Sequence, residues 1–190
     1  DASPPRDGGE DGYDTLTSSA VSKNVLTIGS VLDLTNYTGP EDVQLAGYSS
    51  CGPTDDGRIK PDIVTNGYYL NSTSSGGDAA YSVKSGTSMA AASASGSLVL
   101  LQQAWRQIYN KPMHSATLKA LVVHTARECG PYPGPDFKYG WGLLDLQAAV
   151  ELIQKHHTTS PLVFETRLEN GDSLVIPIRH SGDAPLKVTL

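Results

Sequence analysis

Apolar residues recur every three or four positions between residues 90 and 108, and this spacing predicts a long helix. The pattern stops before Asn110-Lys111-Pro112, a sequence typical of a helix end. A second helix is predicted to start near Ser115 and a third to follow Asp145, because apolar residues follow each start at helical spacing. Residues 25–32, 63–65 and 80–84 are short runs of strand length. Strands mixed with helices in this way predict an α/β domain with parallel strands flanked by helices.

The pattern changes from a helical period to a period of two near residues 157–161, where we place a domain boundary. Residues 162–168, 173–178 and 186–190 are predicted to form strands, with turns at Asn170-Gly171-Asp172 and Ser181-Gly182-Asp183. Residues 1–157 are therefore assigned to one domain, and residues 158–190 to the start of a β-sandwich or jelly-roll module. Three strands are too few to close such a sandwich, so we expect this module to be truncated.

The composition is that of a folded, globular chain, with 190 residues, 38% hydrophobic and 18% charged. The net charge of −6 argues against nucleic acid or an anionic membrane as a partner. No apolar run approaches the ~20 residues that a membrane-spanning helix needs. Cys51 and Cys129 leave two alternatives open: a disulfide in an oxidising compartment, or two free buried thiols.

The most informative stretch is Gly86-Thr87-Ser88-Met89-Ala90, which joins a strand-like run to the long helix. Gly86 lets the backbone turn tightly, and Thr87 is a favourable N-cap residue. Ser88 would then lie in the first helical turn, where backbone N–H groups lack partners and the helix dipole is positive. This environment suits a nucleophile whose attack creates an oxyanion. On these five residues alone, an ordinary capped helix is an equally good interpretation.

Three further stretches accompany this motif: residues 22–31, residues 48–53 together with 56–64, and Tyr139-Gly140-Trp141-Gly142-Leu143-Leu144-Asp145. In this order, the four stretches resemble the carboxyl half of the catalytic domain of subtilisin-like serine proteases, the subtilase family. The resemblance implies a three-layer α/β fold with a mainly parallel sheet, of which this chain holds a part. The strands after residue 158 resemble the module that follows the catalytic domain in some large subtilases.

The resemblance also implies a serine endopeptidase that hydrolyses peptide bonds through an acyl-enzyme. Ser88 matches the nucleophile, and its backbone N–H would help to hold the oxyanion. Tyr81, Ser82 and Val83 match a segment that lines the substrate pocket. The family's Asp and His, and the Asn that donates to the oxyanion, precede the segment that starts near Asn24, and none of them is recognisable here. We therefore expect them in a missing N-terminal half, and we expect the isolated chain to be inactive.

The same resemblance implies polypeptide substrates, a secreted or extracytoplasmic location, and no required cofactor. Calcium as a structural ion has one candidate, the acidic stretch with Asp7, Glu10, Asp11 and Asp14. That stretch lacks the spacing of a calcium-binding loop, so a solvated loop is the favoured interpretation.

One departure from the family pattern lies beside the nucleophile. Relatives usually carry proline four residues after the serine, and Ala92 replaces it here, which predicts a more regular helix and a roomier site. None of the five histidines falls in a family motif, and His124 is expected to be structural.

Two other functions are considered. One is a non-catalytic subtilase-like scaffold or interaction module, which a full-length sequence lacking the Asp or the His would favour. The other is a different serine acyl-transfer enzyme, such as an esterase. The absence of the G-x-S-x-G elbow around Ser88 counts against the esterase.

Overall fold

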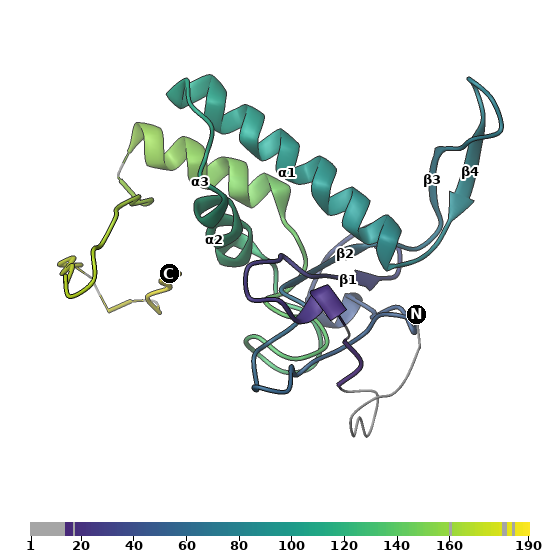
Figure 1. Cartoon of the computed structure of the whole chain (residues 1–190), viewed down its shortest axis with the longest axis horizontal. Helices are drawn as coiled ribbons and strands as arrows, with labels where there is room; N and C mark the ends of the chain where they lie inside the picture. The colour runs from purple at the N-terminus through teal and green to yellow at the C-terminus, as the bar shows by residue number, and fades with distance from the viewer. Residues whose placement is uncertain (1–13, 17, 160, 180–181, 184) are drawn as a thin grey trace.

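The computed structural model describes residues 14–190 except residues 17, 160, 180–181 and 184 (Figure 1). Four short strands precede three helices: β1 (Ile28–Val31), β2 (Ile63–Asn66), β3 (Leu70–Thr73), β4 (Tyr81–Lys84), α1 (Thr87–Tyr109), α2 (Ser115–Thr125) and α3 (Leu146–Thr158). Two short 3-10 helices, η2 (Ser18–Val21) and η3 (Pro40–Asp42), lie in the loops around β1. The three helices and the strands at 25–32, 63–65 and 80–84 are confirmed, each within a few residues of its predicted bounds.

Strands β1 and β2 form the parallel pair that the family resemblance implies, with Ile28 opposite Ile63. On the far side of β2, the Val64 N–H donates to the Gly142 carbonyl at 3.0 Å, and the Leu144 N–H donates to the Val64 carbonyl at 2.9 Å. The stretch at residues 139–145 therefore continues the sheet beyond β2. Strands β3 and β4 form a separate antiparallel hairpin that projects from the body beside the start of α1 (Figure 1).

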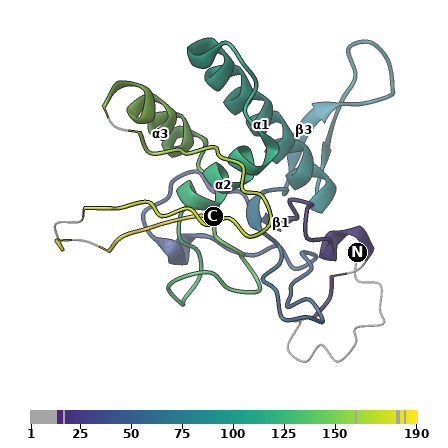
Figure 2. The same cartoon turned by 60° about the vertical axis from the view of Figure 1, so that its left-hand side comes forward.

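Neighbouring residues of β2 point to opposite faces of the sheet, as strand geometry requires. Ile63 is fully buried in a cluster with side chains of all three helices, namely Leu101, Trp105, Leu121, Val122, Ala149 and Ile153. Val64 is buried on the other face, with Val31, Val43 and Cys129. Both views show α1 and α3 side by side, with α2 beneath them (Figures 1 and 2). Within the described residues, helices thus cover one face of the parallel pair and loops cover the other.

The Lys60-Pro61-Asp62 part of the second stretch has a structural role. The Lys60 ammonium is 3% exposed and pairs with Asp62 at 2.6 Å, while it also donates to the Val25 carbonyl at 2.7 Å. Asp62 in turn accepts a hydrogen bond from the Thr27 N–H at 2.6 Å. A buried ammonium needs such partners because the loss of its hydration is costly. These contacts tie the start of β2 to the chain that leads into β1.

The described residues after 160 form neither a helix nor a strand, so the strands expected at 162–168, 173–178 and 186–190 are not formed. A strand needs a neighbour for its backbone N–H and C=O groups, and no ladder satisfies these groups here. The tail instead contacts the helices: Val163 packs against their core, and the Thr117 hydroxyl donates to Glu165 at 2.6 Å. The β-sandwich module and the domain boundary stay predictions.

Candidate active site

Helix α1 begins at the carboxyl ends of the parallel strands. The Gly67 N–H, directly after β2, donates to the Val31 carbonyl at the end of β1, at 3.3 Å. The Gly67 carbonyl accepts hydrogen bonds from the Gly86 N–H at 2.8 Å and from the Tyr48 hydroxyl at 2.9 Å. Three of the four stretches found in the sequence therefore converge on the first turn of α1. The predicted place of Ser88, at a helix N-terminus on the carboxyl side of the sheet, is confirmed.

The N-cap of α1 is Gly86, so the expectation that Thr87 would cap this helix is wrong. Gly86 has a φ of 150° and a ψ of 161°, a conformation that other residues rarely adopt. The chain enters α1 through this glycine turn, and no side chain caps the helix. The Thr87 hydroxyl therefore does not have the capping role that was expected of it. Thr87 and Ser88 become the first two helical residues.

Gly67 allows the backbone of β2 to approach the start of α1 closely. A Cβ at position 67 would lie 2.6 Å from the Gly86 carbonyl oxygen and 2.9 Å from the Ala90 Cβ. We expect Gly67→Ala to lower the free energy of unfolding by about 1–3 kcal/mol, because these atoms must move apart. Gly47→Ala is the matched control, since a Cβ there meets nothing within 4 Å. Denaturant unfolding of the whole protein compares the two; equal stabilities would contradict this role of Gly67.

Ser88 is exposed in the first turn of α1 and lines a cavity of about 420 Å³. The first regular helical bond runs from the Ala90 N–H to the Gly86 carbonyl at 3.2 Å. The N–H groups of Thr87 and Ser88 precede it and have no acceptor within the helix. The serine hydroxyl is thus accessible, and it lies beside backbone donors and the positive end of the helix dipole. Such donors can stabilise negative charge that develops on a bound carbonyl oxygen.

The β3–β4 hairpin forms the other wall of the cavity. Leu70 pairs with Lys84 and Ser72 with Ser82, and because opposite residues share a face, these four side chains lie on the same side of the hairpin. All four line the cavity together with Ser88. The Ser82 hydroxyl is buried there without a hydrogen-bond partner.

The structure brings only one of the three proposed pocket residues into this cavity. Tyr81 and Val83 are 65% and 54% exposed, belong to the other face of β4 and do not line it. Lys84 and Ala92, which were not proposed as pocket residues, do line it. The signal in the sequence was the period of two along the strand: Ser82 and Lys84 share a face, and Tyr81 and Val83 share the opposite one.

No histidine lines the Ser88 cavity among the described residues. The histidines lie elsewhere: His114 is the N-cap of α2, His124 contacts Thr189 of the tail at 3.0 Å, and His156 and His157 are in the last turn of α3. His180 lies outside the described residues. Burial, with a smaller effect of Lys187, lowers the pKa of His124, which favours its neutral form. The described part of the cavity therefore holds a candidate nucleophile without a base.

Cys51 and Cys129 are both buried and both free in the structure. Burial raises the pKa of the Cys129 thiol to about 12, and it also raises the pKa of Cys51. Thiols in this state are poor nucleophiles and poor metal ligands. Within the described ranges, no group of three or more His, Cys, Asp or Glu side chains could hold a metal ion. Of the proposed calcium ligands, Asp7, Glu10 and Asp11 lie outside those ranges.

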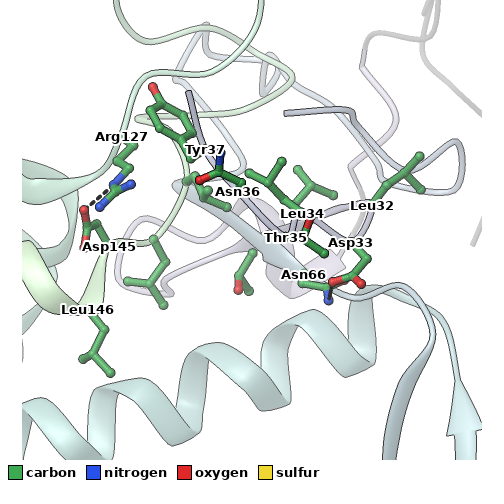
Figure 3. A pocket seen from close by; sticks show the side chains of 14 residues that line it. Leu32, Asp33, Leu34, Thr35, Asn36, Tyr37, Asn66, Arg127, Asp145 and Leu146 are labelled. Carbon is green, nitrogen blue, oxygen red and sulfur yellow. Dashed lines mark hydrogen bonds and ion pairs between the residues drawn. The ribbon is translucent and has the colours of Figure 1, made fainter. Parts of the chain in front are cut away.

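A second cavity of about 290 Å³ lies at the carboxyl ends of β1 and β2 (Figure 3). Each of the charged groups that line it, Asp33, Arg127 and Asp145, has a partner. The Arg127 guanidinium pairs with Asp145 and lies 5.2 Å from the centre of the Tyr37 ring, and the Asn66 amide donates to Asp33 at 2.9 Å. Asp145 also accepts from the Ala148 N–H at 2.9 Å and so caps α3. These contacts give Asp145, the last residue of the fourth stretch, a structural role.

The model of the subtilase family matches residues 7–142 of this chain. The chain belongs to the subtilase family. Pyrolysin from Pyrococcus furiosus is a relative with 31% identity over 163 residues, which cover 78% of this chain and 12% of pyrolysin. The CspB protease of Clostridium perfringens is 28% identical to this subtilase chain in the aligned part, which covers 75% of the chain and 29% of CspB with a TM-score of 0.61.

The patellamide maturation protease PatA has the same fold, with a TM-score of 0.59 and 22% identity over 77% of this chain and 49% of PatA. The subtilase chain thus spans less than half the length of each of these three relatives. Within the described residues, no helix combines the length and the apolar character needed to cross a bilayer.

Proposed function

We propose that Ser88 is the nucleophile of a subtilisin-type serine endopeptidase. The Ser88 hydroxyl attacks the carbonyl carbon of the scissile peptide bond, and a histidine takes the hydroxyl proton. The carbonyl oxygen becomes an oxyanion, which accepts a hydrogen bond from the Ser88 backbone N–H. The C–N bond then breaks as the histidine returns the proton to the leaving amine, and water hydrolyses the acyl-enzyme.

The observation that carries this proposal is the position of Ser88. It is exposed at the start of α1, lines a cavity, and lies at the carboxyl ends of the parallel strands in a chain of the subtilase family. A serine that only capped the helix would accept a hydrogen bond from the backbone, whereas α1 has no side-chain cap. The hydroxyl is therefore free to react with a bound substrate.

The base and its carboxylate partner come from outside this chain, in the part of the catalytic domain that holds the family's Asp and His. The cavity agrees with this arrangement, because no histidine, aspartate or glutamate lines it among the described residues. The substrates are polypeptides, and the enzyme acts outside the cytoplasm, as the resemblance implies.

A whole protein that contains this chain tests the proposal. We expect it to hydrolyse an unstructured polypeptide such as denatured casein, and we expect a serine-directed phosphonate to stop the hydrolysis. The absence of a base in the described cavity leaves one competing function, a non-catalytic subtilase-like scaffold. A folded whole protein that neither hydrolyses peptides nor reacts with the phosphonate would overturn the protease and favour the scaffold.

A further inference from the structure

Lys84 is the one charged residue that lines the Ser88 cavity in the described part of the chain. The other described residues that line this cavity are apolar or neutral: Leu70, Asn71, Ser72, Thr73, Ser82, Ser88, Met89, Ala92 and Ser93. Lys84 is the last residue of β4 and faces the cavity because it shares the face of Ser82. The cavity is thus electropositive on its hairpin side, in a chain whose net charge is −6.

The Lys84 ammonium makes no ion pair and no side-chain hydrogen bond with the described residues. This distinguishes it from Lys60, which is paired with Asp62, and from Lys119, which donates to the Asn24 carbonyl. No carboxylate of the described residues lines the cavity to compensate its charge. An unpaired cation in a substrate cavity favours a ligand that brings a negative charge, because the two opposite charges attract each other.

We infer that Lys84 makes the enzyme prefer polypeptides with an acidic side chain, Asp or Glu, close to the cleaved bond. This inference rests on the proposed role of Ser88, because both residues line the same cavity. The substrate carboxylate lies against the hairpin and pairs with the Lys84 ammonium while Ser88 attacks the backbone carbonyl. The neutral hydroxyl of Ser72, which lies on the same face of the hairpin as Lys84, can hydrogen-bond to the same carboxylate.

The size of the preference follows from the exposure of Lys84. It is an exposed side chain, and pairs between exposed charges contribute little because water screens them. We expect kcat/KM to be about two- to fivefold higher for an acidic than for a neutral side chain at low ionic strength. High salt should reduce this ratio towards one.

The test uses the whole protein and pairs of internally quenched peptides that differ by Glu or Gln at one position near the cleaved bond. Both ends of each peptide are blocked, so that the only difference is the side-chain carboxylate. The ratio of kcat/KM for the Glu peptide to that for the Gln peptide is measured for each variant. We expect this ratio to fall to about one in Lys84→Met and to fall below one in Lys84→Glu, where the charge is reversed.

Lys155→Met is the matched control, because it removes the same charge from the last turn of α3. The neighbouring His156 stacks on Trp105, and Trp105 lies 17 residues along α1 from Ser88, a distance of about 25 Å. This variant should keep the Glu-to-Gln ratio of the unmodified protein. The ratio is taken within each variant, so a partial loss of folded protein does not change it.

Two results separate this inference from the proposed function. Cleavage that requires Ser88 but shows the same Glu-to-Gln ratio in the unmodified protein and in Lys84→Met overturns the role of Lys84 alone. Cleavage that survives Ser88→Ala, or a folded whole protein without cleavage, overturns the nucleophile and this inference with it.

Discussion

Ser88→Ala in the whole protein is expected to reduce kcat for peptide hydrolysis on the order of 10⁶-fold, the size that loss of the nucleophile has in subtilisin. The effect is large because alanine has no atom that can form the acyl-enzyme. The stability should change by less than about 0.5 kcal/mol, because the Ser88 side chain is exposed and caps no helix. Steady-state hydrolysis assays and thermal unfolding measure the two quantities on the same preparation.

Ser95→Ala is the matched control for this change. Ser95 lies on the same helix and is exposed, its hydroxyl donates to the Ala91 carbonyl at 2.8 Å, and it does not line the cavity. We expect it to keep the activity of the unmodified protein. A Ser88→Ala variant with normal kcat would show that Ser88 is not the nucleophile. Equal losses in both variants would point to damage of α1 instead of loss of chemistry.

Residues 1–190, purified alone, are expected to react with a fluorophosphonate about 10²–10⁴-fold more slowly than the whole protein, the range that general-base catalysis contributes. A serine hydroxyl is a weak nucleophile unless a base takes its proton, and no histidine of the described residues lines the Ser88 cavity. The measurement is the rate of fluorophosphonate labelling, with the whole protein as reference.

The comparison requires that the purified chain is folded. Near-UV circular dichroism checks this, since Trp105 is 3% exposed and packs against Tyr109 in the core between the helices. A folded chain that labels at the rate of the whole protein would show that a base lies within residues 1–190. His180 would then be the first histidine to replace, because the other four lie away from the cavity.

The helices could be predicted from the sequence because local signals mark both their faces and their ends. Asn110 ends α1 in the left-handed conformation with a φ of 53°, and the Asp145 side chain caps α3. Strand β3 is not predicted by the sequence, because three of the four residues in Leu70-Asn71-Ser72-Thr73 are polar and the run lacks an alternation of apolar and polar residues. Pairing with β4 creates this strand, and such pairing is not a local property of the sequence.

For the candidate site too, the local motif could be predicted from the sequence, but the residues around it could not. The motif around Ser88 predicted a serine in the first turn of α1, because a glycine turn before a helix is a local feature. The residues that share its cavity depend on the register of the hairpin, which pairs Leu70 with Lys84. Alternate residues of a strand face opposite sides, so the predicted run Tyr81-Ser82-Val83 includes two residues that do not line the cavity, and Lys84 lies just outside it.

The central claim is that Ser88 is the nucleophile, and the most direct test identifies the residue that reacts. The whole protein is treated with a fluorophosphonate and digested, and the modified peptide is sequenced by mass spectrometry. We predict a single phosphonate adduct on Ser88, and none in protein that was denatured before treatment, because reactivity depends on the folded site. Hydrolytic activity together with an adduct on any other residue, and none on Ser88, would contradict the claim.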